Sequence, residues 1–276
     1  MAGFGGEEPL NLMRSITIGQ YMPGVSPIHR LDPRTKIIAL ILYITAIFFV
    51  RTFTGFGAAF LVTAFILGIS KLPVAYVIRG LKPVLFLVVF TILLHFFMTK
   101  GGDVLLQLGP LSVETAGVRL GFFMSLRLLF LVATTSLLTL TTSPIALTDG
   151  IEYLLKPFRR VGLPAHEIAM MMTIALRFIP TLMEESQKIM KAQMARGADF
   201  ESGGLIRRAR SMAPLLVPLF VSAFRRADEL AVAMEARCYG GQAKRTRMKE
   251  LVVTSLDYGA LAAMAVFLLV ITITGL

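Results

Sequence analysis

The sequence predicts an all-α integral membrane protein with about five transmembrane helices and a cytoplasmic module of long amphipathic helices. Three observations support this fold class. The chain of 276 residues is 55% hydrophobic and its mean hydropathy is +0.73, well outside the range of soluble globular domains. Five apolar stretches approach or reach the length that crosses a bilayer. A basic segment with helical periodicity separates the fourth stretch from the fifth.

The five apolar stretches are 37–50, 53–69, 83–98, 118–140 and 256–276. A span needs about 20 apolar residues, so the first and third stretches are short. Flanking Lys36, Arg51 and Lys82 extend them, because long cationic side chains reach outward to the membrane interface. The first two stretches are joined only around Arg51 and predict a tight helical hairpin, with a single buried helical block as the alternative.

The distribution of Lys and Arg predicts the orientation. These residues are concentrated before the first stretch, between the second and third, and across 142–255, whereas the loop 99–117 carries one Lys against two acids. Because cytoplasmic loops favour Lys and Arg, we expect a multi-pass protein of the cell membrane with its amino terminus in the cytoplasm and its carboxyl terminus outside. The expected parts are a cytoplasmic segment (1–36), four membrane helices (37–141), a cytoplasmic module (142–255) and a last membrane helix (256–276).

Three amphipathic helices are expected in the cytoplasmic module. A short helix starts at Ser143-Pro144, and the turn Gly162-Leu163-Pro164 separates it from the next one. The second helix spans about 165–196 and the third about 205–237, each with apolar residues at every third or fourth position.

Three prolines fall inside the two long helices, and methionine is abundant there. Pro180 is expected to bend the second helix, and Pro214 and Pro218 the first half of the third, because proline removes a backbone hydrogen bond. The sequence leaves open whether these bends are hinges or fixed kinks. The chain has 15 methionines, whose flexible side chains suit an interface that repacks.

We expect no Asp or Glu inside any predicted span, whereas ion-coupled carriers and intramembrane hydrolases normally need buried ionisable groups. His95 lies in the third span, where we expect a neutral imidazole bonded to a neighbouring helix backbone; a ligand or proton-relay role is the alternative. Arg127 lies deep in the fourth span and needs a partner, either carbonyl groups or an acid on another helix or subunit.

Several classes of function are disfavoured. The chain lacks a glycine-rich phosphate-binding loop, and its single cysteine, Cys238, argues against disulfides and thiol-bound metal. We therefore expect no cofactor, no metal site and no catalysis. The net charge of +11 is better explained by anionic lipid beside the basic loops than by nucleic acid, because no stacking aromatic residues accompany the basic ones.

Two nearly identical tripeptides are the best clue to function. Ala195-Arg196-Gly197 and Ala236-Arg237-Cys238 each close one of the long amphipathic helices. An arginine in a last helical turn can simply complement the negative end of the helix dipole, with glycine as the cap. Two copies favour a second interpretation, in which each arginine grips a carboxylate or exposed carbonyl groups of a partner protein. Two such ends suit a pair of similar partners.

These tripeptides resemble motifs of a known family, the transmembrane (T) component of energy-coupling factor transporters. Further strings strengthen the resemblance, which covers most of the chain. They are Ile18-Gly19-Gln20-Tyr21 with Ser26 and His29, Leu31-Asp32-Pro33-Arg34-Thr35-Lys36, Leu163-Pro164-Ala165-His166-Glu167, Ala175-Leu176-Arg177-Phe178-Ile179-Pro180, and Gln193-Met194 before the first tripeptide. One departure is Cys238, which stands where the family motif has glycine; we expect docking to survive, with Gly240-Gly241 taking over the helix stop.

The resemblance implies a non-catalytic scaffold that couples ATP hydrolysis to uptake. Its implied partners are two ABC-type ATPase subunits, each receiving one arginine-tipped coupling helix, and a small membrane protein (the S component) that captures a vitamin or metal ion. Three alternatives belong to other classes: a secondary transporter, a conventional ABC permease subunit that lines its own substrate path, and a membrane enzyme. The substrate is not readable from this chain, because in this family the S component selects it.

Overall fold

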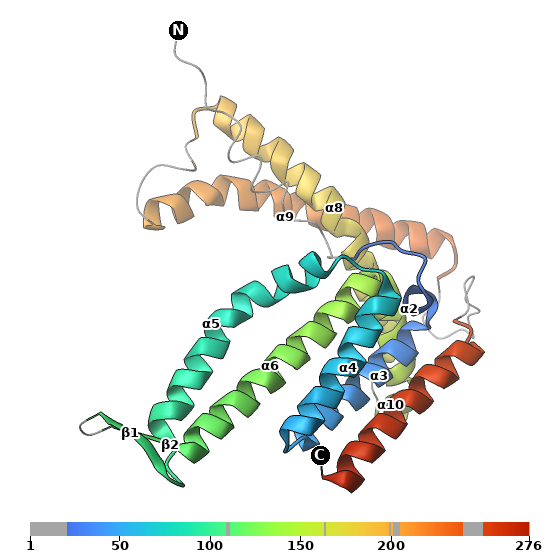
Figure 1. Cartoon of the computed structure of the whole chain (residues 1–276). Coiled ribbons are helices and arrows are strands. Elements are labelled where there is room, and N and C mark those ends of the chain that lie inside the picture. The colour runs from blue at the N-terminus through green and yellow to red at the C-terminus, as the bar shows by residue number, and fades with distance from the viewer. Residues whose placement is uncertain are drawn as a thin grey trace. The chain divides into compact units, whose positions relative to one another are not determined.

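A computed structural model describes residues 21–108, 111–162, 164–198, 200, 205–239 and 251–275. The chain divides into two compact units, whose described residues are 21–154 with 251–275, and 155–239. We call the first the apolar unit and the second the long-helix unit (Figure 1). The predicted motif residues Ile18, Gly19, Gln20 and Leu163, and the pair Gly240-Gly241, lie outside the described residues.

The apolar unit contains seven helices in its described part. They are α2 (Pro27–Arg30), α3 (Pro33–Phe49), α4 (Phe53–Ser70), α5 (Val74–Met98), α6 (Thr115–Thr141), α7 (Pro144–Leu155, of which the last residue falls in the other unit) and α10 (Ser255–Thr274). The all-α membrane fold predicted from the sequence is confirmed. Among the described residues, four helices are long and apolar enough to cross a membrane: α4, α5, α6 and α10.

The first predicted span corresponds to α3, which is shorter than the other four. It has 17 residues, and a typical bilayer core needs about 20. Its side chains are nevertheless well packed, since Tyr43, Ala46 and Ile47 are almost completely buried. The hydroxyl of Tyr43 donates to the carbonyl of Ala59 at 3.2 Å, which joins α3 to α4. The first two stretches thus form a helical hairpin, as predicted, and not one continuous helical block.

Local sequence explains where these helices begin and end. Asp32 caps α3 by accepting a hydrogen bond from the backbone N–H of Arg34, and Pro33 occupies the first helical position. Thr52 caps α4 in the same way. Thr254 and Asp257 form a reciprocal capping box at the start of α10. Each cap replaces backbone partners that the first turn of a helix lacks.

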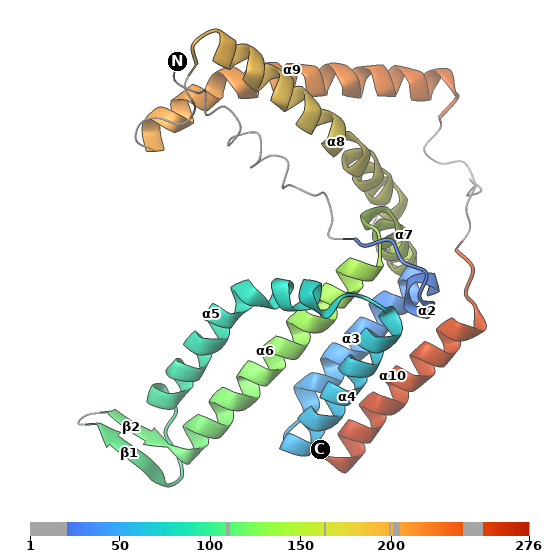
Figure 2. The ribbon, with the colours of Figure 1, turned by 45° about the horizontal axis from the view of Figure 1, so that its top comes forward.

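α5 and α6 form a closely packed pair that depends on small residues in α6. A Cβ atom added to Gly117 would lie 2.7 Å from the carbonyl oxygen of His95, and one added to Gly121 would lie 3.2 Å from the Cβ of His95. Glycines four residues apart let two membrane helices approach at backbone distance. The bend of α5 in its first half, visible in Figure 2, coincides with Pro83 inside that helix.

The predicted loop between α5 and α6 contains a small sheet that the sequence analysis did not anticipate. Strands β1 (Val104–Leu108) and β2 (Leu111–Glu114) pair antiparallel. The Leu-rich composition of this loop does not alternate cleanly, so its periodicity gives little indication of a strand.

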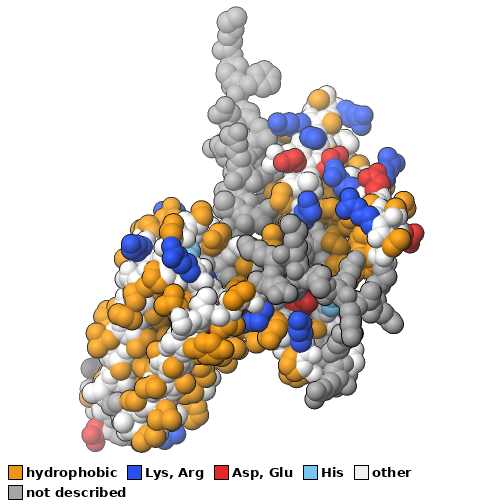
Figure 3. Space-filling model, turned by 90° about the vertical axis from the view of Figure 1, so that its right-hand side faces the viewer, with side chains coloured by type: hydrophobic (Ala, Val, Ile, Leu, Met, Phe, Trp, Pro, Cys, Tyr) orange, Lys and Arg blue, Asp and Glu red, His pale blue; other side chains and the backbone are white. Residues whose placement is uncertain are grey.

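The long-helix unit contains the 3₁₀ helix η1 (Lys156–Val161), α8 (Ala165–Ala195) and α9 (Leu205–Ala236). Both long helices start and end within one residue of the predicted bounds. α7 matches the predicted short helix, but belongs to the apolar unit up to residue 154. Figure 3 shows hydrophobic side chains dominating the visible surface of the membrane helices, and Lys, Arg and acidic side chains gathered on the long helices.

The close approach at Gly117 can be tested by adding a single methyl group. Gly117→Ala is expected to lower the free energy of unfolding by ~1–3 kcal/mol, because α5 must move away from α6 to relieve the overlap. Thermal unfolding in detergent measures this. Gly57→Ala is the matched control, since nothing lies within 4 Å of a Cβ at Gly57. Equal stability of the two variants would contradict the packing described for α5 and α6.

Candidate functional site

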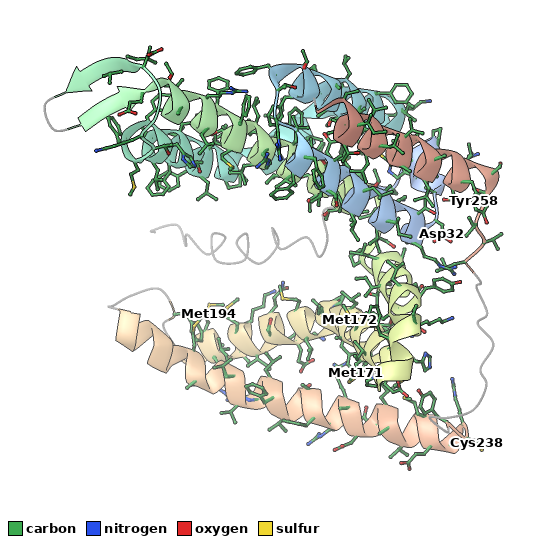
Figure 4. The ribbon with its side chains drawn as sticks, turned by 90° about the horizontal axis from the view of Figure 1, so that it is seen from below. Asp32, Met171, Met172, Met194, Cys238 and Tyr258 are labelled. Atoms are coloured by element: carbon green, nitrogen blue, oxygen red, sulfur yellow. The ribbon has the colours of Figure 1, made fainter. Side chains whose placement is uncertain are left out.

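The two long helices run antiparallel, so their carboxyl-terminal ends lie at opposite ends of the pair. Two contacts define this arrangement: Arg226 of α9 lies 3.4 Å from the carboxylate of Glu185 of α8, and the hydroxyl of Tyr239 donates to the sulfur of Met170 at 2.7 Å. Figure 4 shows Met194, near the end of α8, and Cys238, just past the end of α9, at opposite ends. With 31 residues in α8 and a rise of about 1.5 Å per residue, the two ends are separated by ~45 Å.

The end of α8 has the backbone of a Schellman motif. Gly197 adopts a left-handed conformation with φ of +86°. Its N–H donates to the carbonyl of Met194 at 2.9 Å, and the N–H of Ala198 donates to the carbonyl of Gln193 at 3.0 Å. These are the two bonds that define the motif, which places Arg196 at the C-cap position.

The end of α9 repeats the same geometry residue by residue. Cys238 has a φ of +55°. Its N–H donates to the carbonyl of Glu235 at 2.8 Å, and the N–H of Tyr239 donates to the carbonyl of Met234 at 3.0 Å. Arg237 therefore occupies the same C-cap position as Arg196.

This geometry corrects the expectation that Gly240-Gly241 would stop the helix. Cys238 itself takes the left-handed conformation and stops α9, although a residue with a Cβ is strained there by ~1–2 kcal/mol. The hydrogen bonds of Cys238 and Tyr239 hold it in place. With Cys238 at this position, Arg237 occupies the C-cap of α9, as Arg196 does in α8.

Both tripeptides are accessible. Ala195, Arg196 and Gly197 are exposed, as are Ala236, Arg237 and Cys238. Among the described residues neither guanidinium has an ion-pair partner, whereas Arg226 on the same helix pairs with Glu185. Two guanidinium groups, each at a helix end, are thus available to a ligand.

The prolines bend the long helices without ending them. Pro180 lies inside α8, and Pro214 and Pro218 lie inside α9. Figure 2 shows the bend in the first half of α9. α9 also exposes a row of large apolar side chains, and these are Leu216, Val217, Phe220, Val221 and Phe224. The predicted apolar stripe of α9 is therefore only partly covered by α8.

The two polar residues predicted inside the spans have different surroundings. Arg127 donates to the carbonyls of Ile47, Phe48 and Val50 at 3.2–3.3 Å, the last turn of α3. It therefore satisfies carbonyl groups that the end of a helix leaves unpaired. His95 shares a 3.0 Å hydrogen bond with the hydroxyl of Thr99 on the same helix, and not with a neighbouring helix backbone as expected.

The structure also shows a buried carboxylate within a predicted span, so the expectation that the spans contain no acid is wrong. Asp257, the second residue of the last predicted stretch, has 0% exposure. One of its oxygens accepts the N–H of Asp32 at 2.8 Å, and the other accepts the N–H and the hydroxyl of Thr254, each at 2.7 Å. Its side chain thus joins the start of α10 to the start of α3.

Two basic residues of the Leu31–Lys36 string lie close to Asp32 or Asp257. Arg34 lies 3.7 Å from Asp32 and stacks 3.5 Å from the ring centre of Tyr153 in α7. Lys36, just before the first predicted span, donates to the carbonyl of Thr141 at 3.0 Å. Burial lowers the pKa of Lys36 to about 8, and the charges of Asp257 and Asp32 oppose this shift. We call Asp32, Arg34, Lys36, Thr254 and Asp257 the polar cluster.

The fold and these helix ends define a class: a multi-pass membrane protein with a pair of long amphipathic helices that present arginine at both ends. The model of the CbiQ family, described as cobalt transport protein, matches residues 24–249. The chain belongs to this family, in agreement with the resemblance found in its motifs.

Three relatives are similar over nearly their whole length. Each carries the name energy-coupling factor transporter transmembrane protein EcfT. The protein from Thermosediminibacter oceani is 61% identical over 91% of this chain and 94% of its own. That from Heliobacterium modesticaldum is 54% identical over 94% and 97%, and that from Bacillus subtilis is 49% identical over 92% and 96%.

The strained backbone of Cys238, where α9 ends, gives a prediction. The equivalent position of α8, Gly197, provides a control for which the opposite change in stability is expected. Cys238→Gly is expected to stabilise the end of α9 by ~1 kcal/mol, and Gly197→Ala to destabilise the end of α8 by a similar amount. No atom lies within 4 Å of a Cβ at Gly197, so only backbone strain acts there. Hydrogen exchange of the amides of Tyr239 and Ala198 measures both effects. Faster exchange at Tyr239 in Cys238→Gly would show that the thiol side chain, and not the backbone, holds this end.

The buried carboxylate gives a second prediction. Asp257→Asn keeps the shape of the side chain but replaces one acceptor oxygen by a donor facing other donors, so we expect a loss of ~2–3 kcal/mol in the free energy of unfolding. Denaturant unfolding in detergent measures it. Asp228→Asn on the exposed face of α9 is the control and is expected to change little. A loss of the same size in both variants would exclude a special role for Asp257.

Proposed function

We propose that this chain is the T component of an energy-coupling factor importer. In this role it transmits conformational changes of two ABC-type ATPase subunits to an S component that carries a micronutrient, a vitamin or a metal ion. The observation that carries the proposal is the pair of equivalent helix ends, each with an exposed arginine in the same backbone geometry.

The separation of the two ends supports two partners and not one. The ends lie ~45 Å apart on an antiparallel pair, whereas their local geometry is the same. A single small protein would not present one binding groove to both ends. Two copies of one ATPase, held as a dimer, would present one equivalent groove to each end. The identical caps therefore fit a homologous or identical pair of motor subunits.

The chemistry of the C-cap arginine supports docking. The guanidinium offers five donors in a planar fork that matches a carboxylate or a pair of carbonyl groups. Because the left-handed residue turns the chain away directly after each arginine, the side chain is presented at the tip of the helix. We propose that Arg196 and Arg237 each enter a groove of one ATPase subunit, with the flanking small Ala195, Gly197, Ala236 and Cys238 permitting close approach.

The exposed apolar row on α9 supports contact with a membrane partner. Contiguous apolar surface on a helix otherwise rich in charge marks an interaction site. We propose that this row contributes to the surface that holds the S component. Movement of the ATPases shifts α8 and α9 as levers, and the bends at Pro180, Pro214 and Pro218 lie within these levers, because both helices continue through them.

In this proposal the chain itself is not an enzyme, and ATP is hydrolysed by the partner subunits. It resides in the cell membrane with its amino terminus in the cytoplasm and its carboxyl terminus outside. A conventional permease subunit would work without a separate substrate-capturing protein, and a secondary transporter would work without ATPases. Copurification from native membranes distinguishes these classes: we expect both ATPase subunits and a small membrane protein.

Removal of the helix-end charges tests the docking role. Arg196→Ala and Arg237→Ala are each expected to weaken ATPase binding by ~2–5 kcal/mol, because each loses a charge-assisted contact. The double variant is expected to lose ATP-driven uptake in a reconstituted complex. Arg225→Ala is the matched control, an exposed arginine of α9 away from the helix end. Full uptake by the double variant would refute the proposed role.

A further inference from the structure

The apolar unit contains a cavity that the proposed coupling role does not use. It has a volume of about 360 Å³ and lies among α2, α3, α4, α6 and α10. This volume falls in the range of small-molecule sites. The wall is apolar almost throughout, and representative lining residues are Leu40, Ile66, Ile69, Leu137, Ala260 and Met264.

The few polar groups of the wall already have partners. Lys36 donates to the carbonyls of Thr141 and His29. Tyr43 bonds Ala59 and Thr63, and the hydroxyls of Thr134 and Thr141 donate to carbonyls of their own helix. A polar solute would leave water here without gaining hydrogen bonds, which is costly. The cavity therefore fits an alkyl chain and not a polar micronutrient.

The position of the cavity points to the bilayer as the source of that chain. α4, α6 and α10 are candidate membrane spans, so hydrocarbon surrounds the walls. Two exposed cations lie at the ends of lining elements: Arg30 is the last residue of α2, and Lys71 is the C-cap of α4. α2 packs against α4, and among the described residues neither cation has an ion-pair partner.

We propose that this cavity binds one acyl chain of an anionic phospholipid, whose headgroup phosphate lies at Arg30 and Lys71. The apolar wall selects the chain, and the two cations select the charge of the headgroup. Both cations lie at the end that the charge distribution predicts to be cytoplasmic. The bound lipid then fills the space between α3, α4 and α10.

Native mass spectrometry of the full-length protein tests whether the cavity binds the acyl chain of a lipid. The chain is purified in mild detergent with an equal mixture of phosphatidylglycerol and phosphatidylcholine, and the retained lipid is counted. We expect one phosphatidylglycerol per chain. Ala260→Phe, which places a ring in the cavity, is expected to reduce retention at least about tenfold, since losing two buried methylene groups already costs that much. Ala262→Phe on the same helix does not line the cavity and is expected to retain lipid as the natural chain does.

A second pair of variants tests the headgroup. Arg30→Gln with Lys71→Gln is expected to abolish the preference for phosphatidylglycerol over phosphatidylcholine while one lipid is still retained. Ala263→Leu also places a larger side chain in the cavity, but a smaller one than phenylalanine. It replaces Ala260→Phe in the retention measurement if Ala260→Phe does not elute as a monodisperse species. Absence of lipid from the natural chain, including a cavity occupied by a protein segment, would overturn the proposal. Equal retention by the Ala260→Phe and Ala262→Phe variants, or an unchanged headgroup preference in the double Gln variant, would also overturn it.

Discussion

The buried carboxylate of Asp257 is the interaction on which the apolar unit depends. It accepts two hydrogen bonds from Thr254 and one from the backbone N–H of Asp32. Asp32 lies 225 positions away in the sequence. A carboxylate without exposure is tolerated only when its oxygens are satisfied and cations lie nearby. Lys36 interacts electrostatically with Asp257 and with Asp32, and Arg34 lies 3.7 Å from Asp32. Lys36 also binds the end of α6, and Arg34 stacks on the ring of Tyr153 in α7. The polar cluster thus fixes the starts of α3 and α10 and holds α7 against the membrane helices.

Much of the fold and of the candidate site could be predicted because the relevant signals are local. Pro33, Pro144 and Thr254 sit at helix starts, where proline or a capping hydroxyl is favoured. Gly197 ends α8 because glycine adopts the left-handed conformation without strain. Apolar periodicity gave the bounds of α8 and α9 to within one residue. The arginine at each helix end follows from these bounds, so its exposure was predictable as well.

What could not be predicted depends on contacts between distant residues or on context. From the sequence alone, Asp257 looks like an ordinary acid at the membrane interface, because its contact with Asp32 is visible only in the structure. Arg127 finds carbonyl partners only because the short helix α3 ends at its depth. The positive φ of Cys238 is the opposite of what its side chain favours; the hydrogen bonds of the Schellman motif impose it. The antiparallel arrangement of α8 and α9, which separates the two arginines, likewise follows from tertiary contacts.

Site-specific photocrosslinking in the ATPase-bound complex tests the central claim most directly. Ala192 and Ala233 precede Arg196 and Arg237 by one helical turn and are both exposed, so a photoreactive residue at either position leaves the arginines intact. The account predicts that each position crosslinks to an ATPase subunit, and that a probe at exposed Tyr258 of α10 does not. Crosslinks from 192 and 233 to lipid alone while the ATPases are bound would contradict it.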